Sequence, residues 1–143
     1  MPILNYTTKI DSYKTITEIQ QMLSKAGATK IIIDNKDGLP SGLTFCIIWR
    51  TNMTAFALPC NSEGVLRAMK NNSRVPKNLR SQEQALRVSW RILKEWIAAQ
   101  LAIVEAELCQ LPEVFLPYAV TKDGDTMFNY IENRGQNLLG PSN

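Results

Sequence analysis

The sequence predicts an α+β fold: an N-terminal helix, a three-stranded antiparallel meander, a short helix, one long helix in the C-terminal half and an extended C-terminal arm. Two observations predict this order. Segments with apolar residues at helical spacing open at capping residues and close at glycine or proline. Between them, three short runs of β-branched and aromatic residues are joined by turns too short for a parallel crossover, so the strands are expected to pair antiparallel.

The first helix and the three strands occupy the first sixty residues. Thr15 and Glu18 have the spacing of a capping box, and Gly27 is typical of a helix end, so a helix is expected over residues 16–25. Its apolar residues share one face, which indicates that it packs against another element. The three strands are expected at residues 30–34, 43–50 and 54–58, with turns at residues 35–42 and 51–53.

A short helix follows the last strand. Asn61 or Ser62 caps it, and it is expected to extend to about Lys70. Residues 71–79 are polar and contain a proline, but this segment is too short to separate two domains. We expect it to be an exposed basic loop within a single domain that comprises residues 1–143.

The long helix dominates the second half of the chain. Ser81 and Gln84 have the spacing of a capping box and Pro112 stops the helix, so it is expected over about residues 81–110. Two neighbouring rows of apolar side chains make a stripe wider than one three-stranded sheet needs. At about 1.5 Å per residue the helix spans roughly 40 Å, which favours a homo-oligomer that shares it. The alternative is a helix enclosed between the sheet and the C-terminal segment of its own chain.

The C-terminal segment has little helical periodicity, and Pro112 and Pro117 lie at its start. Residues 113–120 form an apolar run that follows the first of these prolines and contains the second, and they are expected to be an extended arm over hydrophobic surface. Residues 122–125 are expected to form a turn and residues 126–132 one or two helical turns. Residues 133–143 are expected to be a flexible polar tail.

Composition excludes several classes of function. The chain has no histidine, so it lacks the commonest general base and zinc ligand. Cys46, Cys60 and Cys109 have neither a disulfide nor a metal-binding spacing and are expected to be buried thiols. We therefore expect a protein that is not an enzyme and that binds no cofactor and no metal. Since no run approaches the ~20 apolar residues that span a bilayer, and no signal-peptide pattern is found, we expect a cytoplasmic protein without a membrane partner.

Half of the positive charge lies in one fifth of the chain. Residues 67–94 hold eight of the sixteen Lys and Arg residues and one acid, which makes this segment net +7, while the other eight bases and twelve acids make the remainder net −4. A segment of this charge attracts anions. The eight bases are Arg67, Lys70, Arg74, Lys77, Arg80, Arg87, Arg91 and Lys94.

A ligand site is expected within this basic segment. Arg87, Arg91 and Lys94 are four and three residues apart and therefore form one ridge on the long helix. The cations are expected to hold phosphates, Trp90 or Tyr118 to stack on a base, and Asn61 to add a hydrogen bond. A solvated helix face, with Arg91 paired to Glu95 and Glu83 to Arg87, is the alternative. The predicted ligand-binding residues are Asn61, Arg67, Arg87, Trp90, Arg91, Lys94 and Tyr118.

Three segments carry a resemblance to a known family. They are Leu58-Pro59-Cys60-Asn61 with Gly64-Val65-Leu66-Arg67, residues 85–96 with Ala99-Gln100, and residues 113–119. In these segments, and from the first residue to about Tyr130, the sequence resembles small proteins of unassigned function that bacteriophages and prophages carry. The resemblance implies no catalytic residues. It implies an accessory role, which in small phage proteins often means countering a host defence.

These observations lead to one leading hypothesis of function and two alternatives. The leading hypothesis is a phage anti-defence protein that binds and sequesters a small phosphorylated or cyclic nucleotide signal at a subunit junction in the host bacterial cell. The first alternative is a nucleic-acid-binding module that uses residues 67–94. The second is an inhibitor that docks directly on a host defence protein through the apolar face of the long helix.

Overall fold

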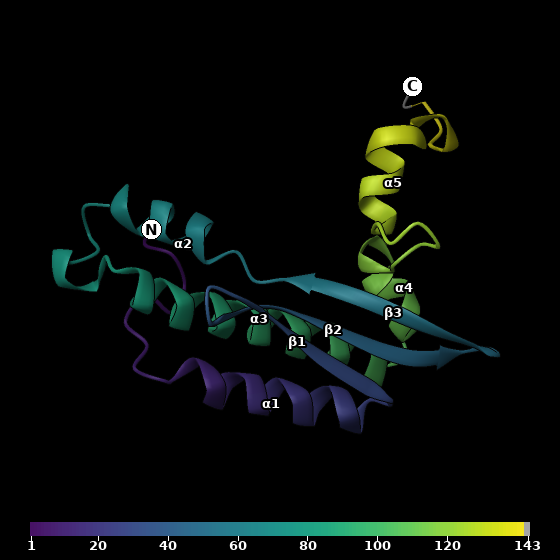
Figure 1. Cartoon of the computed structure of the whole chain (residues 1–143), viewed down its shortest axis with the longest axis horizontal. Coiled ribbons are helices and arrows are strands. Elements are labelled where there is room, and N and C mark those ends of the chain that lie inside the picture. The colour runs from purple at the N-terminus through teal and green to yellow at the C-terminus, as the bar shows by residue number, and fades with distance from the viewer. Residues whose placement is uncertain (142–143) are drawn as a thin grey trace.

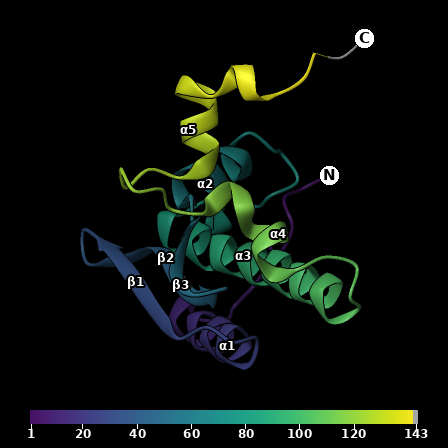
Figure 2. The ribbon, with the colours of Figure 1, turned by 90° about the vertical axis from the view of Figure 1, so that its right-hand side faces the viewer.

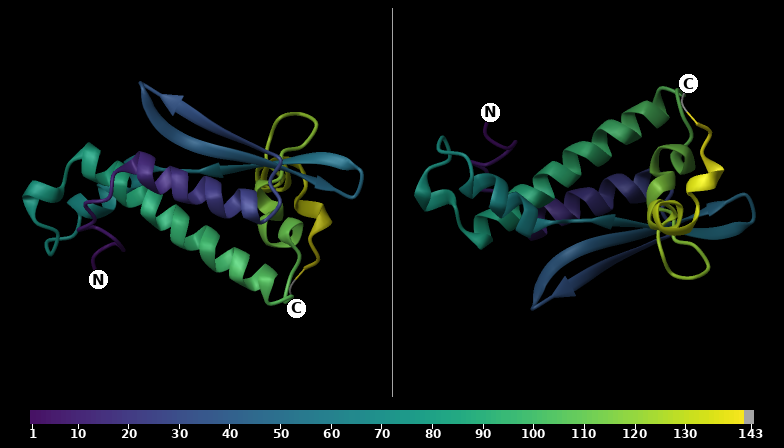
Figure 3. Two further views of the ribbon diagram at one scale, coloured as in Figure 1. Left: turned by 90° about the horizontal axis from the view of Figure 1, so that it is seen from below. Right: turned by 90° about the horizontal axis from the view of Figure 1, so that it is seen from above.

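The computed structural model describes residues 1–141 and has the α+β fold that the sequence predicts (Figure 1). In chain order the elements are α1 (Ser12–Lys25), β1 (Lys30–Lys36), β2 (Leu39–Trp49), β3 (Asn52–Pro59), α2 (Ser62–Lys70), the 3-10 helix η1 (Lys77–Leu79), α3 (Gln82–Glu105), α4 (Leu111–Phe115), the 3-10 helix η2 (Leu116–Tyr118), α5 (Met127–Arg134) and the 3-10 helix η3 (Gln136–Leu138). Helices α1 and α3 lie on one face of the sheet, and α2 packs against α3 (Figure 2). The opposite face has no helix over most of its area (Figure 3).

The sheet is an antiparallel meander in the order β1-β2-β3. All three strands are longer than predicted, because both turns are tighter than predicted. Between β1 and β2 the turn has two residues, Asp37 and Gly38, with φ values of +54° and +79°. Asp-Gly is a preferred pair for this left-handed turn. Between β2 and β3 the residues of the turn are Arg50 and Thr51.

Helix α1 begins four residues earlier than predicted, at Ser12 instead of residue 16. Its N-cap is Asp11, whose carboxylate accepts a hydrogen bond of 3.1 Å from the backbone N–H of Tyr13. Thr15, the predicted cap, is completely buried inside the helix. Asp and Thr both cap helices, so burial of the first turn selected between them. The helix ends at the predicted place, where Gly27 has a φ of +111°.

Helix α3 is the centre of the fold. A larger hydrophobic cluster lies between α3, α1 and the sheet, and a smaller one lies between α3 and α2. The two apolar rows of α3 are therefore covered mainly by its own chain as far as Ile97, which is completely buried. Up to that point, no second subunit is required to bury the apolar stripe. Farther along, Ala98, Ala102 and Leu108 are exposed.

Helix α3 ends at Glu105, about five residues before the predicted end. Glu107 takes a φ of +61°, and the N–H of Leu108 donates to the carbonyl of Ile103 over 3.1 Å. This is the hydrogen bond of a Schellman motif, in which glycine is the usual left-handed residue. The sequence has no glycine there, so the end was not recognisable from residue types.

The prediction of an extended arm over residues 113–120 is wrong. This segment forms α4 and η2 before Ala119 pairs with Phe56 at the edge of β3. Pro112 and Pro117 lie in the first turns of these short helices, where a missing N–H breaks no hydrogen bond. The segment does cover hydrophobic surface as expected, because Phe115 is completely buried.

Helix α5 projects away from the rest of the molecule (Figure 1). It corresponds to the helical turns predicted at residues 126–132, and η3 follows it within the predicted tail, of which residues 142 and 143 lie outside the described residues. Among residues 1–141, no helix is long and apolar enough to cross a membrane.

Candidate functional site

The eight bases of residues 67–94 divide into two groups of four. Those of the first group are engaged by the protein itself. Arg80 donates to two backbone carbonyls, of Val75 and Asn72, at 2.9 and 3.2 Å. Arg87 donates to Glu83 at 2.6 Å, the pair expected from its i,i+4 spacing. The remaining two members of this group, Arg91 and Lys94, pair with a carboxylate on another helix.

That carboxylate is Glu18 of α1. Its two oxygens accept from Arg91 Nη1 at 3.2 Å and from Lys94 Nζ at 2.6 Å. The pair between Arg91 and Glu95, which belonged to the alternative of a solvated helix face, is not formed among the described residues. The hydrogen bond from Lys94 and the charges of Lys94 and Arg91 outweigh the cost of burial and hold the pKa of Glu18 below its ordinary value of 4.5. Two of the three cations of the predicted ridge, Arg91 and Lys94, thus form a bridge between α1 and α3.

We expect the substitution Glu18→Gln to flatten the acid side of the stability profile. Since the pKa of Glu18 is lowered by folding, the unfolded chain takes up a proton first as pH falls below about 4.5, and the native state loses stability there. Above that pH the full contribution is present. Urea unfolding at a series of pH values should show the gap between wild type and Glu18→Gln closing as the solution becomes acidic.

The matched control for this prediction is Glu95→Gln. Glu95 is an exposed carboxylate on α3 and has no ion pair among the described residues. Its replacement should leave the slope of stability against pH unchanged. An equal flattening in both variants would show that the effect reflects total charge and that the bridge contributes nothing of its own.

Trp90 does not belong to any ligand site. It is completely buried, and its indole Nε1 donates to the carbonyl of Pro40 at 3.3 Å. With no surface available, it cannot stack on a base, and this part of the predicted site is wrong. Tyr118 and Asn61 are closer to the prediction, since both line one groove between the end of β3, the start of α2, the middle of α3 and η2.

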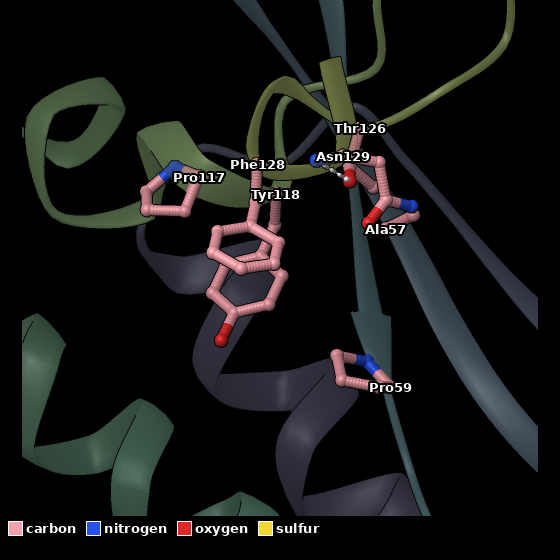
Figure 4. A pocket seen from close by; sticks show the side chains of 7 residues that line it. All are labelled: Ala57, Pro59, Pro117, Tyr118, Thr126, Phe128 and Asn129. Atoms are coloured by element: carbon pink, nitrogen blue, oxygen red, sulfur yellow. Dashed lines mark hydrogen bonds between the residues drawn. The ribbon is translucent and has the colours of Figure 1, made fainter. Parts of the chain in front are cut away.

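This groove has a volume of about 330 Å³. Its walls are largely apolar, and the rings of Trp96 and Tyr118 meet edge to face with their centroids 5.5 Å apart. Asn61 is partly occupied as the N-cap of α2, because its Oδ1 accepts from Gly64 N–H at 2.8 Å. A second hollow lies on the other side of Tyr118 and Pro59, against the first turn of α5 (Figure 4). None of the predicted phosphate-binding cations lines either hollow.

The polar chemistry of the groove is weak. Cys60 donates through its thiol to Ser89 Oγ at 3.4 Å, and Ser89 donates on to the carbonyl of Leu86 at 3.0 Å. Burial raises the pKa of Cys60 to about 11, so the thiol stays protonated at neutral pH and is not a nucleophile. Within the described residues, no cluster of three or more acids or cysteines could hold a metal ion.

The second group of bases is exposed. Arg67 and Lys70 lie three residues apart in the last turns of α2, and Arg74 and Lys77 follow in the loop and in η1. None of the four forms an ion pair within the described part of the chain, and the sequence has no acid between Glu63 and Glu83. We call these four residues the cationic end. It lies at the opposite end of the molecule from α5 (Figure 1).

The loop that carries Arg74 is held in a defined conformation. Val75 is completely buried between α2 and α3, and the guanidinium of Arg80 binds the carbonyls on both sides of Arg74, at residues 72 and 75. The predicted ligand-binding residues include Arg67, whereas Lys70, Arg74 and Lys77 belong only to the alternative that uses residues 67–94. All four lie in a run of nineteen residues without an acid, from Gly64 to Gln82, but so does Arg80, which the protein binds internally. The run therefore marks a basic segment and does not separate exposed cations from bound ones.

Comparisons with models of protein families, with curated proteins and with solved structures find no match for this chain. The structure itself defines the class of protein, which is an α+β protein with a three-stranded antiparallel sheet. The resemblance to phage proteins stays a prediction.

Proposed function

We propose that this chain is a non-catalytic binding protein whose cationic end engages the phosphate backbone of a nucleic acid. The observation that carries the proposal is the exposure of Arg67, Lys70, Arg74 and Lys77, none of which has a carboxylate partner among residues 1–141. Lys and Arg in such positions release counterions from a nucleic acid when they contact its phosphates, and this release favours binding. A role against a host defence rests on the resemblance to phage proteins and is part of this proposal.

The placement of these cations favours a polymer over a small nucleotide as the partner. A small anion is usually held in a concave pocket, whereas a nucleic-acid backbone can lie across an exposed surface. None of the four cations lines any of the five hollows described in this structure. The other four bases of the segment are already bound to carboxylates or carbonyls of the protein.

The salt dependence of binding tests this function. With four phosphate contacts, the affinity for a short DNA or RNA duplex should fall on the order of 100-fold between about 50 and 200 mM salt. In fluorescence-anisotropy titrations, the variant with Arg67, Lys70, Arg74 and Lys77 all replaced by alanine should lose most of both the affinity and the salt slope.

The control carries the same change in charge at other exposed positions. Alanine at Lys9, Lys25, Lys30 and Lys122 also lowers the net charge from +3 by four, and all four residues are exposed. This control should keep the salt slope of the wild type. Equal losses of affinity and salt slope in the two variants would show that binding depends on net charge and not on the cationic end. A wild type that binds no nucleic acid at low salt would overturn the proposed function.

One observation favours sequestration of a small nucleotide as a second candidate. Asn61, Trp96 and Tyr118 share the groove of about 330 Å³, a size and composition that suit a flat ring. Calorimetry with cyclic and linear nucleotides addresses it directly. Binding tighter than about 10 μM, equal to roughly 7 kcal/mol, that persists at high salt would favour this candidate.

A further inference from the structure

Two apolar features at the same end of the molecule have no partner in the described structure. The first is the hairpin tip, residues 48–53, where β2 turns into β3. The second is the arm crook, the hollow between η2, α5 and η3. The elements that carry them, the turn between β2 and β3 and the segment around α5, lie at the end remote from the cationic end (Figure 1). A two-fold contact between copies requires both features on one side of the molecule.

The hairpin tip combines large apolar side chains with one positive charge. Ile48 and Met53 face each other across the strands and are 53% and 57% exposed. Trp49 is also exposed, and Arg50 follows it in the turn without an ion pair among the described residues. Trp and Arg are both among the residue types enriched at the energetic centre of protein interfaces.

The arm crook offers a complementary surface. Its volume is about 390 Å³, and most of its wall is apolar. Of the described residues that line it, Glu132 is the single charged one, so no cation among them accompanies it there. The residues that form the crook are Leu116, Pro117, Met127, Phe128, Ile131, Glu132, Gln136 and Leu139.

The arm is attached at its start, where Met127 packs against the main hydrophobic cluster and its N–H donates to the carbonyl of Ala119 at 2.8 Å, but the rest of α5 has little burial to hold it in place. No residue of α5, all of which is described, is buried, and the helix has only eight residues. A helix of this length is not stable in water on its own propensity. Phe128 and Leu139 also remain more than half exposed. A partner that fills the crook would remove this apolar surface from water and stabilise α5 at the same time.

We propose that the hairpin tip of one copy inserts into the arm crook of a second copy, and that the reciprocal contact forms a two-fold dimer. Trp49 occupies the crook against Phe128 and Leu139, and Arg50 pairs with Glu132 of the other copy. The tip carries one cation and no acid, and the described residues of the crook include one acid and no cation, so the two surfaces match in charge as well as in polarity. This dimer does not depend on binding by the cationic end.

Charge reversal and its rescue test the contact. Sedimentation analysis of the wild type should show a concentration-dependent species with twice the mass of 16.1 kDa. Arg50→Glu and Glu132→Arg should each raise the dissociation constant of the dimer at least about tenfold, because each places like charges together. The double variant, with the pair exchanged, should recover most of the wild-type affinity.

Two controls and one further variant make the result specific. Lys9→Glu changes the charge as Arg50→Glu does, at an exposed position outside both features, and should leave the dimer intact. Trp49→Ala should dissociate it, and circular dichroism verifies that every variant is folded. A wild type that stays monomeric at several hundred μM, a dimer that neither reversal weakens, or a double variant that fails to recover would each overturn the proposal.

Discussion

Replacement of Trp90 by alanine is expected to lower the free energy of unfolding by roughly 3–5 kcal/mol. Trp90 is the largest completely buried side chain of the described residues and packs between α1 and the sheet. The substitution leaves a cavity and also leaves the carbonyl of Pro40 without its indole donor, which lies 3.3 Å away. Urea unfolding followed by circular dichroism measures the loss.

Two further variants keep this prediction testable if Trp90→Ala is too unstable to study. Trp90→Phe retains a ring and should cost less than Trp90→Ala, about 1–3 kcal/mol. Trp49→Ala removes an indole that is 38% exposed and, at concentrations too low for association, should cost less than about 1 kcal/mol. If Trp90→Ala costs no more than Trp49→Ala, the core position of Trp90 is refuted.

The second large effect is expected at Phe115, where alanine should also cost roughly 3–5 kcal/mol. Phe115 is completely buried in an aromatic cluster, with ring centroids 5.3 Å from Phe45, 6.3 Å from Phe56 and 5.5 Å from Trp96. Edge-to-face pairs of this kind add stability beyond the area that they bury. Phe115 therefore joins the C-terminal segment to the sheet.

Limited proteolysis distinguishes this role from a general loss of stability. In Phe115→Ala, cleavage within residues 116–141 should accelerate more than cleavage in α1, since the anchor of the C-terminal segment is lost. Phe115→Leu should retain most of the stability, and Tyr13→Ala, at an aromatic residue that is 55% exposed, should have little effect. Uniform acceleration along the whole chain would argue against a local anchor.

Local chemistry explains which elements could be predicted. Ser81 caps α3 as expected, and Asn61, one of the two residues expected to cap α2, does so, because a cap depends on a side chain and a backbone N–H only three residues away. The end of α3 and the start of α1 were misplaced for the opposite reason. Glu107 adopts a left-handed conformation that its residue type does not favour, and Thr15 would have been as good a cap as Asp11 had burial not decided between them.

In the candidate site, too, the local arrangement of residues was predictable and the long-range contacts were not. The helical spacing of Arg87, Arg91 and Lys94 correctly places them along one helix, but Glu18, the partner of the last two, is 73 residues before Arg91 in the chain. Residue spacing carries no information about which carboxylate folds against a ridge at such a separation. For this reason the sequence could not distinguish bound cations from exposed ones, and the exposed group lies elsewhere, at Arg67, Lys70, Arg74 and Lys77.

Taken by itself, the chain's order of residues determined the α+β class, the order of its main elements and the concentration of positive charge in residues 67–94, because periodicity, capping and charge are local properties. Only the tertiary structure decided that half of those cations are neutralised or bound internally, that Trp90 belongs to the core, and that α5 projects from the molecule. Each of these depends on long-range packing, which brings together groups whose separation along the chain has no pattern.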